Sequence, residues 1–328
     1  MFDRLSGGWA GGDGAASVAL PDGRTLWVFG DTIIGRPADS GPAYAPGAHM
    51  VHNSFVLQDG GVLSPVNGPG GGEVLPNGPD GAFSWPTAGI VDGGALILFS
   101  SRMHANGTGS FDFAQLGTDV AVVDLPRGSD PVVRTVRKVS ADNGTTSPAW
   151  GQSLVRVGAW IYVYGTRTDP RPYHFGKELY VARARPGQLT DVRSWQYHDG
   201  HRFGPRADQA RALIGAAGGV STTLRVLVSP DGRATIVSKR GEFLGTDVRA
   251  WTAPTPAGPF RLAPKRLFAA PSGRTAGELV YLAEAHPQFQ LPGGRTLVTV
   301  SRNNTDLRKV LADRLLFRPQ FHAVTLPR

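Results

Sequence analysis

The chain has 328 residues, a formal net charge of +8 at pH 7 and no cysteine. The absence of cysteine excludes disulfides, thiolate metal sites and a thiol nucleophile. Glycine and proline are abundant, but 41% of the residues are apolar, which is typical of a turn-rich globular protein and not of a disordered one. The charge comes from scattered arginines without a dense basic run, and no apolar run has the length of a membrane span. We therefore expect neither nucleic acid nor membrane as a partner.

Residues 11–32, GGDGAASVALPDGRTLWVFGDT, predict a β-hairpin with a carboxylate at each open end. A turn centred on Asp22 makes the numbers of opposed residues sum to 44, which places Asp13 opposite Asp31. Directly opposed Cβ atoms lie about 4.5–5.5 Å apart, and like charges at that distance repel each other. Folding gains nothing from this repulsion, so the pair indicates a function. The alternative is that both acids simply end strands in solvent.

The hairpin pattern occurs five times in all, and helical periodicity is limited to residues 306–316. The second strands of the units end at residues 31, 101, 166, 240 and 302. Repeated antiparallel units of this length predict an all-β, five-bladed β-propeller, with a pair of β-sandwiches as the alternative. We expect a single domain over residues 1–328, with blades at approximately 9–67, 83–127, 148–200, 220–262 and 278–328.

The spacing of the repeats also predicts which acids meet. When the spacings between the strand ends are added in turn to position 13, the counterparts of Asp13 in the other units are Phe83, Pro148, Thr222 and Glu284. Since the fifth blade closes onto the first, Asp13, Asp31 and Glu284 are expected to converge at one mouth of the channel. Repulsion and burial there raise at least one pKa, as glycoside hydrolysis requires of its acid. Alternatively, Glu284 bonds only backbone amides.

Polar and aromatic residues near these acids are candidates for binding a sugar. They are His52, Asn53, Trp85, Trp150, Gln152, His286 and Asn303. Tryptophans packed between blades and asparagines that form turns are the alternatives. His49 and His52 have the spacing of a metal pair but no third ligand accompanies them, so we expect neither a metal nor a cofactor.

Two segments carry a resemblance to a known family. Residues 8–35, GWAGGDGAASVALPDGRTLWVFGDTIIG, followed by MVHNSFVL at residues 50–57, resemble glycoside hydrolase family 183, a propeller family once known only as a conserved domain of unknown function. Fainter likeness extends to SPAWGQSL and AEAHPQF, at residues 147–154 and 283–289. That family comprises endo-D-arabinanases acting on the D-arabinan of mycobacterial arabinogalactan and lipoarabinomannan. The resemblance implies Asp13 and Asp31 as the carboxylate pair.

The sequence thus predicts a glycoside hydrolase that cleaves internal α-D-arabinofuranosyl linkages in a cell-wall arabinan. We expect a monomer that is secreted or associated with the cell wall, with any export signal outside this sequence. A propeller that binds glycans without cleaving them, or a glycosidase for a different furanoside, is the alternative. A sialidase is disfavoured because the S-x-D-x-G-x-T-W box is absent.

Overall fold

The computed structural model describes all residues except 1, 3, 4, 6, 7, 39, 42, 108, 110, 111, 143, 172–174 and 328. Over the described residues the fold is built from β-strands, with one short α-helix, α1 (Leu307–Ala312). This confirms the all-β prediction, and α1 lies inside the segment expected to be helical. No helix in the described part of the chain has the length and apolarity to cross a bilayer.

Five antiparallel sheets follow one another along the chain. The first contains β2 (Ala16–Ala19), β3 (Thr25–Phe29), β6 (Ser54–Asp59) and β7 (Val62–Val66). The second contains β8 (Phe83–Asp92), β9 (Ala95–Ala105), β10 (Phe113–Asp124) and β11 (Val132–Lys138). The third contains β12 (Ala149–Val157), β13 (Trp160–Thr168), β14 (Lys177–Ala184), β15 (Gln196–His198) and β16 (Phe203–Gly204).

The fourth sheet contains β17 (Leu224–Val228), β18 (Ala234–Lys239), β19 (Asp247–Ala253), β20 (Arg261–Leu262) and β21 (Phe268–Ala269). The fifth contains β22 (Glu278–Leu291), β23 (Arg295–Asn304) and β24 (Gln320–Val324). A small additional sheet joins β1 (Trp9–Gly12), β4 (Thr32–Ile34) and β5 (His49–Val51). Short 3₁₀ helices connect several strands: η2 (Pro69–Gly71), η3 (Gly144–Thr146), η4 (Val192–Ser194), η5 (Ala207–Gln209) and η6 (Glu242–Leu244).

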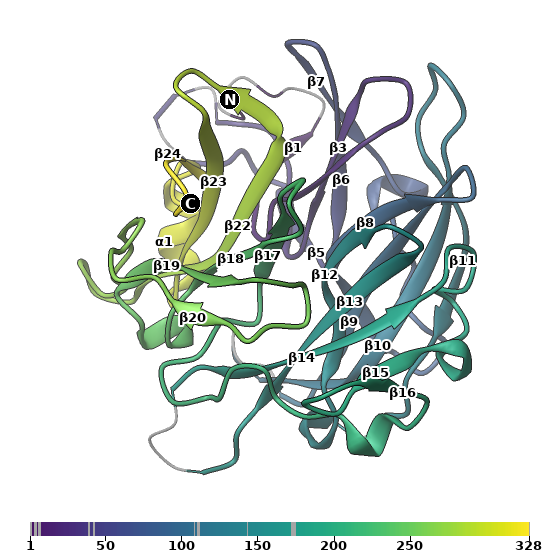
Figure 1. Cartoon of the computed structure of the whole chain (residues 1–328). Helices are drawn as coiled ribbons and strands as arrows, with labels where there is room; N and C mark the ends of the chain where they lie inside the picture. Colours follow the sequence, from purple (N-terminus) through teal and green to yellow (C-terminus); the bar gives the residue numbers. More distant parts are fainter. Residues whose placement is uncertain are drawn as a thin grey trace.

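The first strand of each of the five sheets contacts the first strand of the next sheet. The contacts run from β2 to β8, β12, β17 and β22 and return from β22 to β2. In Figure 1, β8, β12 and β17 lie toward the middle of the molecule, whereas β11 and β24 lie near its edge. The first strands therefore form a closed ring, and the later strands of each sheet extend outward.

Alternation along the strands fills the space between neighbouring sheets. In β2, Val18 packs in a cluster that reaches Leu98 of the second sheet, whereas Ser17 contacts His286 of the fifth. Trp27 is fully buried and its ring lies 4.8 Å from the ring of His286. Successive side chains of a strand point to opposite faces, so each strand contributes to two cores.

The predicted register of the opening hairpin is confirmed. Ala16 pairs with Val28, and on the far side of the aspartates Gly12 pairs with Thr32, so both pairs sum to 44. The predicted alignment of Glu284 with Asp13 needs correction, because β22 contains a register shift between Tyr281 and Glu284. Leu282 within this shift has a positive φ of 50°, and an offset counted along the sequence does not reveal such an irregularity.

Candidate active site

Asp13 and Asp31 lie side by side where the small additional sheet meets the first sheet. The amide of Asp13 donates to the carbonyl of Asp31 at 3.1 Å, and the amide of Gly30 donates to the carbonyl of Asp13 at 2.9 Å. A Cβ on residue 30 would lie 2.7 Å from Oδ1 of Asp13, so glycine leaves the space that this carboxyl group occupies. The backbone itself holds the two acids together.

Asp13 has the electrostatics of a protonated acid. It is 9% exposed, and its pKa is raised to about 8, first by burial and second by the charge of Asp31. The phenol of Tyr281 donates a hydrogen bond to Oδ2 of Asp13 at 2.5 Å, which offsets part of that rise. Near neutral pH the pair therefore holds a proton, and burial favours Asp13 as its position.

Tyr281 is a site residue that the sequence reasoning missed. It comes from β22 and is buried, and Asn303 donates to its hydroxyl oxygen at 3.1 Å. The amide of Gly14 also donates to Oγ of Ser301 on β23 at 3.0 Å. Asn303, which was predicted to bind a sugar, thus positions Tyr281. Through Tyr281, the fifth sheet orients Asp13 of the first hairpin. The signal for Tyr281 was its place on the first strand of the fifth unit, three residues before Glu284.

Asp31 is the more accessible acid, with 26% of its side chain exposed. The indole of Trp85 donates to its Oδ1 at 2.8 Å, and Nδ1 of His52 lies 3.2 Å from the same oxygen. The ring of His52 stacks on Phe83 at 3.8 Å. The structure thus brings two of the predicted sugar-binding residues, His52 and Trp85, to the acid pair.

Glu284 lies apart from the two aspartates, contrary to the predicted convergence. It is fully buried, and Nη1 of Arg225 lies 3.4 Å from its Oε1, whereas its Oε2 has no partner. Burial raises the pKa of Glu284 to about 8 and Arg225 lowers it, with no contribution from Asp13 or Asp31. Glu284 lies on β22 beyond the register shift that follows Tyr281.

His286 is also buried, between the fifth and first sheets, so its predicted role as a sugar ligand is corrected. Its Nδ1 lies 2.6 Å from Oγ of Ser17 and its Nε2 lies 2.8 Å from Oγ1 of Thr299. Burial lowers the pKa of His286 to about 3. The ring is therefore neutral and links two sheets.

Three further predicted sugar ligands are buried in the same way. Asn53 is fully buried, and its amide bonds the backbone of Leu75 and Ser84. Gln152 is 1% exposed, and Trp150 packs with its ring 5.5 Å from that of Tyr197. Asn53 thus bonds the backbone of neighbouring segments, whereas the amide nitrogen and oxygen of Gln152 are buried without a hydrogen-bond partner. Trp150 also borders a cavity of about 660 Å³.

The described residues contain no cluster of three or more His, Asp or Glu side chains arranged to hold a metal ion. What the site offers is acid–base chemistry. A buried, protonated carboxyl group stands beside a more exposed carboxyl group, with an indole N–H and a phenol O–H fixing their orientation. Two carboxyl groups in different environments can divide the roles of acid and base.

The fold is shared with solved structures that include glycoside hydrolases. A "putative hydrolase" from Bacteroides ovatus has a TM-score of 0.76 and 17% identity, over 98% of this chain and 87% of that one. A GH43_1 enzyme from Xanthomonas citri, solved with xylotriose, has a TM-score of 0.53 and 14% identity, over 97% and 88%. An α-L-arabinofuranosidase from Lactobacillus brevis has a TM-score of 0.53 and 11% identity, over 96% and 91%.

At these identities the likeness shows the fold alone. The family is shown by the sequence: the model described as "Domain of unknown function (DUF5005)" matches residues 1–325, and the chain belongs to that family. No curated protein matches it.

Proposed function

We propose that the protein is a glycoside hydrolase built on a five-bladed β-propeller. The five successive sheets, whose first strands form a closed ring, would be the blades. The likeness to the GH43_1 enzyme and to the arabinofuranosidase supports this architecture, since enzymes of the GH43 type are five-bladed propellers. Activity requires an argument from the site, because one fold serves many functions.

The observation that carries the proposal is the buried Asp13, with a pKa raised to about 8, beside the partly exposed Asp31. In the proposed reaction Asp13 gives its proton to the leaving glycosidic oxygen as the bond to the anomeric carbon breaks. Asp31, as a carboxylate, either attacks that carbon or removes a proton from the water that attacks it. Tyr281 and Trp85 hold the two groups in place. Glu284 stays a third candidate acid. Because it is buried apart from the two aspartates, it takes neither of these two roles.

For the substrate we propose the D-arabinan of a mycobacterial-type cell wall, cleaved at internal α-D-arabinofuranosyl linkages. The resemblance of residues 8–35 and 50–57 to glycoside hydrolase family 183 supports this substrate. A monomer that is secreted or wall-associated would meet such a polymer. The partly exposed His52 and Trp85 beside Asp31 offer an imidazole and an indole for contact with sugar hydroxyls and C–H faces.

The test is incubation with mycobacterial arabinogalactan and lipoarabinomannan, with L-arabinan and xylan as comparison polymers, followed by oligosaccharide analysis. We expect a mixture of oligosaccharides from the D-arabinan polymers only. Release of monosaccharide alone would refute internal cleavage, and hydrolysis of only a comparison polymer would refute the substrate. Glycan binding without any cleavage would favour a binding module.

A further inference from the structure

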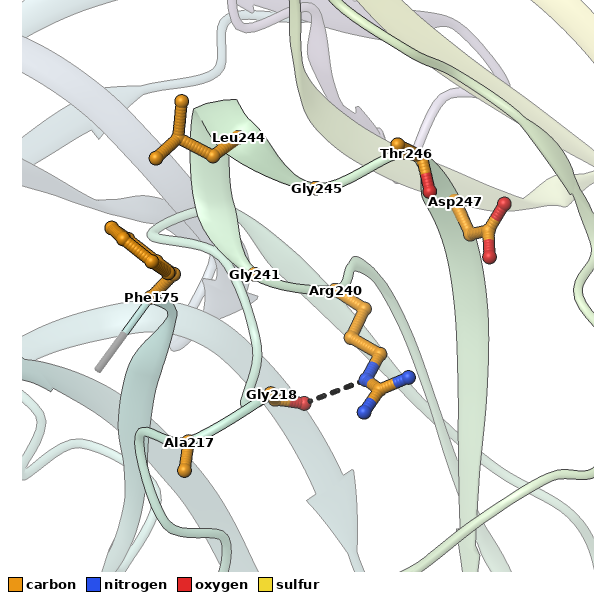
Figure 2. A pocket seen from close by; sticks show the side chains of 9 residues that line it. All are labelled: Phe175, Ala217, Gly218, Arg240, Gly241, Leu244, Gly245, Thr246 and Asp247. Atoms are coloured by element: carbon orange, nitrogen blue, oxygen red, sulfur yellow. Dashed lines mark hydrogen bonds between the residues drawn. The ribbon is translucent and has the colours of Figure 1, made fainter. Parts of the chain in front are cut away.

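A cavity of about 340 Å³ lies beside the fourth sheet and has no role in the acid site. Figure 2 shows Phe175 and Leu244 on one side of it and Arg240 and Asp247 on the other. Several glycines line the space between them, which keeps it open. One side of the cavity is apolar and the other carries charged groups.

The apolar side is unusually exposed. Phe175 is 52% exposed and Leu244 is 69% exposed, although burial of such side chains is favourable by about 1.5–3 kcal/mol each. Large apolar side chains gathered at a hollow indicate a surface that contacts a ligand. They offer a surface on which the C–H face of a sugar ring can pack.

The charged side presents hydrogen-bond donors. Nε of Arg240 donates to the carbonyl of Gly218 at 3.2 Å, which fixes the direction of the guanidinium. Arg240 is exposed, and among the described residues no carboxylate forms an ion pair with it, so its terminal nitrogens can donate to a ligand. A Cβ on Gly218 would lie 2.7 Å from Nη2 of Arg240, so glycine leaves room for this arrangement. Asp247 adds carboxylate acceptors, one of them 3.4 Å from Arg266.

One short helix separates this cavity from the acid pair. In η6, the ring of Phe243 lies 5.2 Å from that of Tyr281, the residue that bonds Asp13. The next residue, Leu244, lines the cavity. η6 therefore connects the lining of the cavity to the residue that bonds Asp13.

The helix is held firmly enough to act as a wall. The carboxylate of Glu242 accepts hydrogen bonds from the amide of Thr222 at 2.9 Å and from the hydroxyls of Ser221 and Thr222. Buried Lys239 donates to the carbonyl of Phe243 at 3.2 Å. These contacts hold η6 at Glu242 and at Phe243.

We propose that this cavity is a remote subsite that binds a sugar residue of the glycan whose bond is cleaved at Asp13 and Asp31. This inference rests on the proposed function. The sugar packs a C–H face on Phe175 and Leu244, while Arg240 donates to its hydroxyl oxygens and Asp247 accepts from its hydroxyl groups. Only a long substrate reaches both the acid pair and this cavity, so binding energy from the cavity favours long substrates over short ones.

The test compares Arg240→Ala and Leu244→Ser with wild type on polymeric arabinan and on the shortest oligosaccharide that is cleaved. Both residues are exposed, so the variants are expected to fold. Arg240→Ala loses one or two charge-assisted hydrogen bonds, and Leu244→Ser loses apolar contact area, so kcat/KM on the polymer, relative to the short substrate, should fall about 2- to 10-fold for each variant. Leu315→Ser, at another exposed leucine (52% exposed), serves as the matched control and should leave the ratio unchanged.

Binding measurements separate this inference from the proposed function. Titration calorimetry with arabino-oligosaccharides of increasing length uses the Asp31→Asn background, in which turnover is blocked. If the wild type cleaves no glycan but Arg240→Ala still weakens the binding of long oligosaccharides, the subsite stands and the hydrolase proposal fails. If the wild type cleaves arabinan and the cavity variants match it in both assays, the subsite is refuted. If the wild type cleaves no glycan and the cavity variants bind long oligosaccharides as tightly as it does, both the subsite and the hydrolase proposal are refuted.

Discussion

The Asp13→Asn variant probes the acid pair through stability and activity together. In the unfolded chain Asp13 releases its proton near pH 3.8, whereas in the folded protein it keeps the proton to about pH 8. Between these values the folded state binds more protons than the unfolded state, so the free energy of unfolding falls as pH rises. Asparagine, which does not titrate, removes this fall.

The size of the effect follows from the pKa shift. The difference between 3.8 and about 8 is about 4 units, and each unit corresponds to about 1.4 kcal/mol. The full shift therefore sets an upper limit of ~6 kcal/mol, of which ~4 kcal/mol is reached at pH 7. Part of the shift comes from the charge of the neighbouring Asp31 and not from burial, and we expect Asp13→Asn to be more stable by about 2 kcal/mol at pH 7. Near pH 4 the two proteins should unfold alike.

The assay is thermal unfolding of wild type and Asp13→Asn from pH 4 to pH 8, with hydrolysis measured on the same samples. Activity should fall by at least about 10²-fold, because general acid catalysis is lost. Asp22→Asn is the control: it lies at the turn of the same hairpin, and Arg24 lowers the pKa of Asp22. That variant should keep its activity. A stability difference between Asp13→Asn and wild type that does not change with pH would refute the raised pKa, and retained activity would refute the acid role.

Three other substitutions test the neighbours of the pair. Tyr281→Phe removes a hydrogen bond that lowers the pKa of Asp13, so the basic limb of the pH profile of kcat/KM should move to higher pH. A basic limb at the same pH as in wild type would contradict the hydrogen bond between Tyr281 and Asp13. Trp85→Phe keeps a ring but removes the N–H that bonds Asp31, and kcat should fall about 10- to 100-fold in steady-state assays, in line with a hydrogen bond to a charged group; a kcat equal to that of wild type would count against this orientation. When thermal unfolding is measured at pH 6.5 and at pH 4, the stability of His286→Gln should fall less on acidification than that of wild type. The reason is that the unfolded histidine takes up a proton below pH 6.5 and the buried one only near pH 3; equal losses would contradict a neutral His286.

Sequence reasoning was most successful where local rules decide the structure. The turn at Asp22 set the pairing of the first hairpin, and that pairing continues through Asp13 and Asp31. The sequence placed His52 and Trp85 near the acid pair as sugar ligands, and in the structure both contact Asp31. Turn chemistry and strand alternation act over a few residues, so they can be read from the chain.

The errors arose where a strand departs from regular pairing. The shift in β22 moves Tyr281 to Asp13 and separates Glu284 from it, and nothing in the residue types marks its position. Asn53, Gln152 and His286 are polar residues that the fold buries. Polarity alone did not distinguish a side chain that the fold buries from one that faces a ligand, because burial depends on contacts distant in sequence.

The most direct test of the central claim is the rate of reducing-end formation from mycobacterial arabinogalactan by wild type and by Asp31→Asn at equal concentrations of folded protein. Asp31 is partly exposed, so its replacement should not prevent folding. The account predicts steady release of oligosaccharides by wild type and a rate at least about 10²-fold lower for the variant, with binding of the polymer retained. Equal rates for the two proteins would contradict the assignment of Asp13 and Asp31 as the catalytic pair.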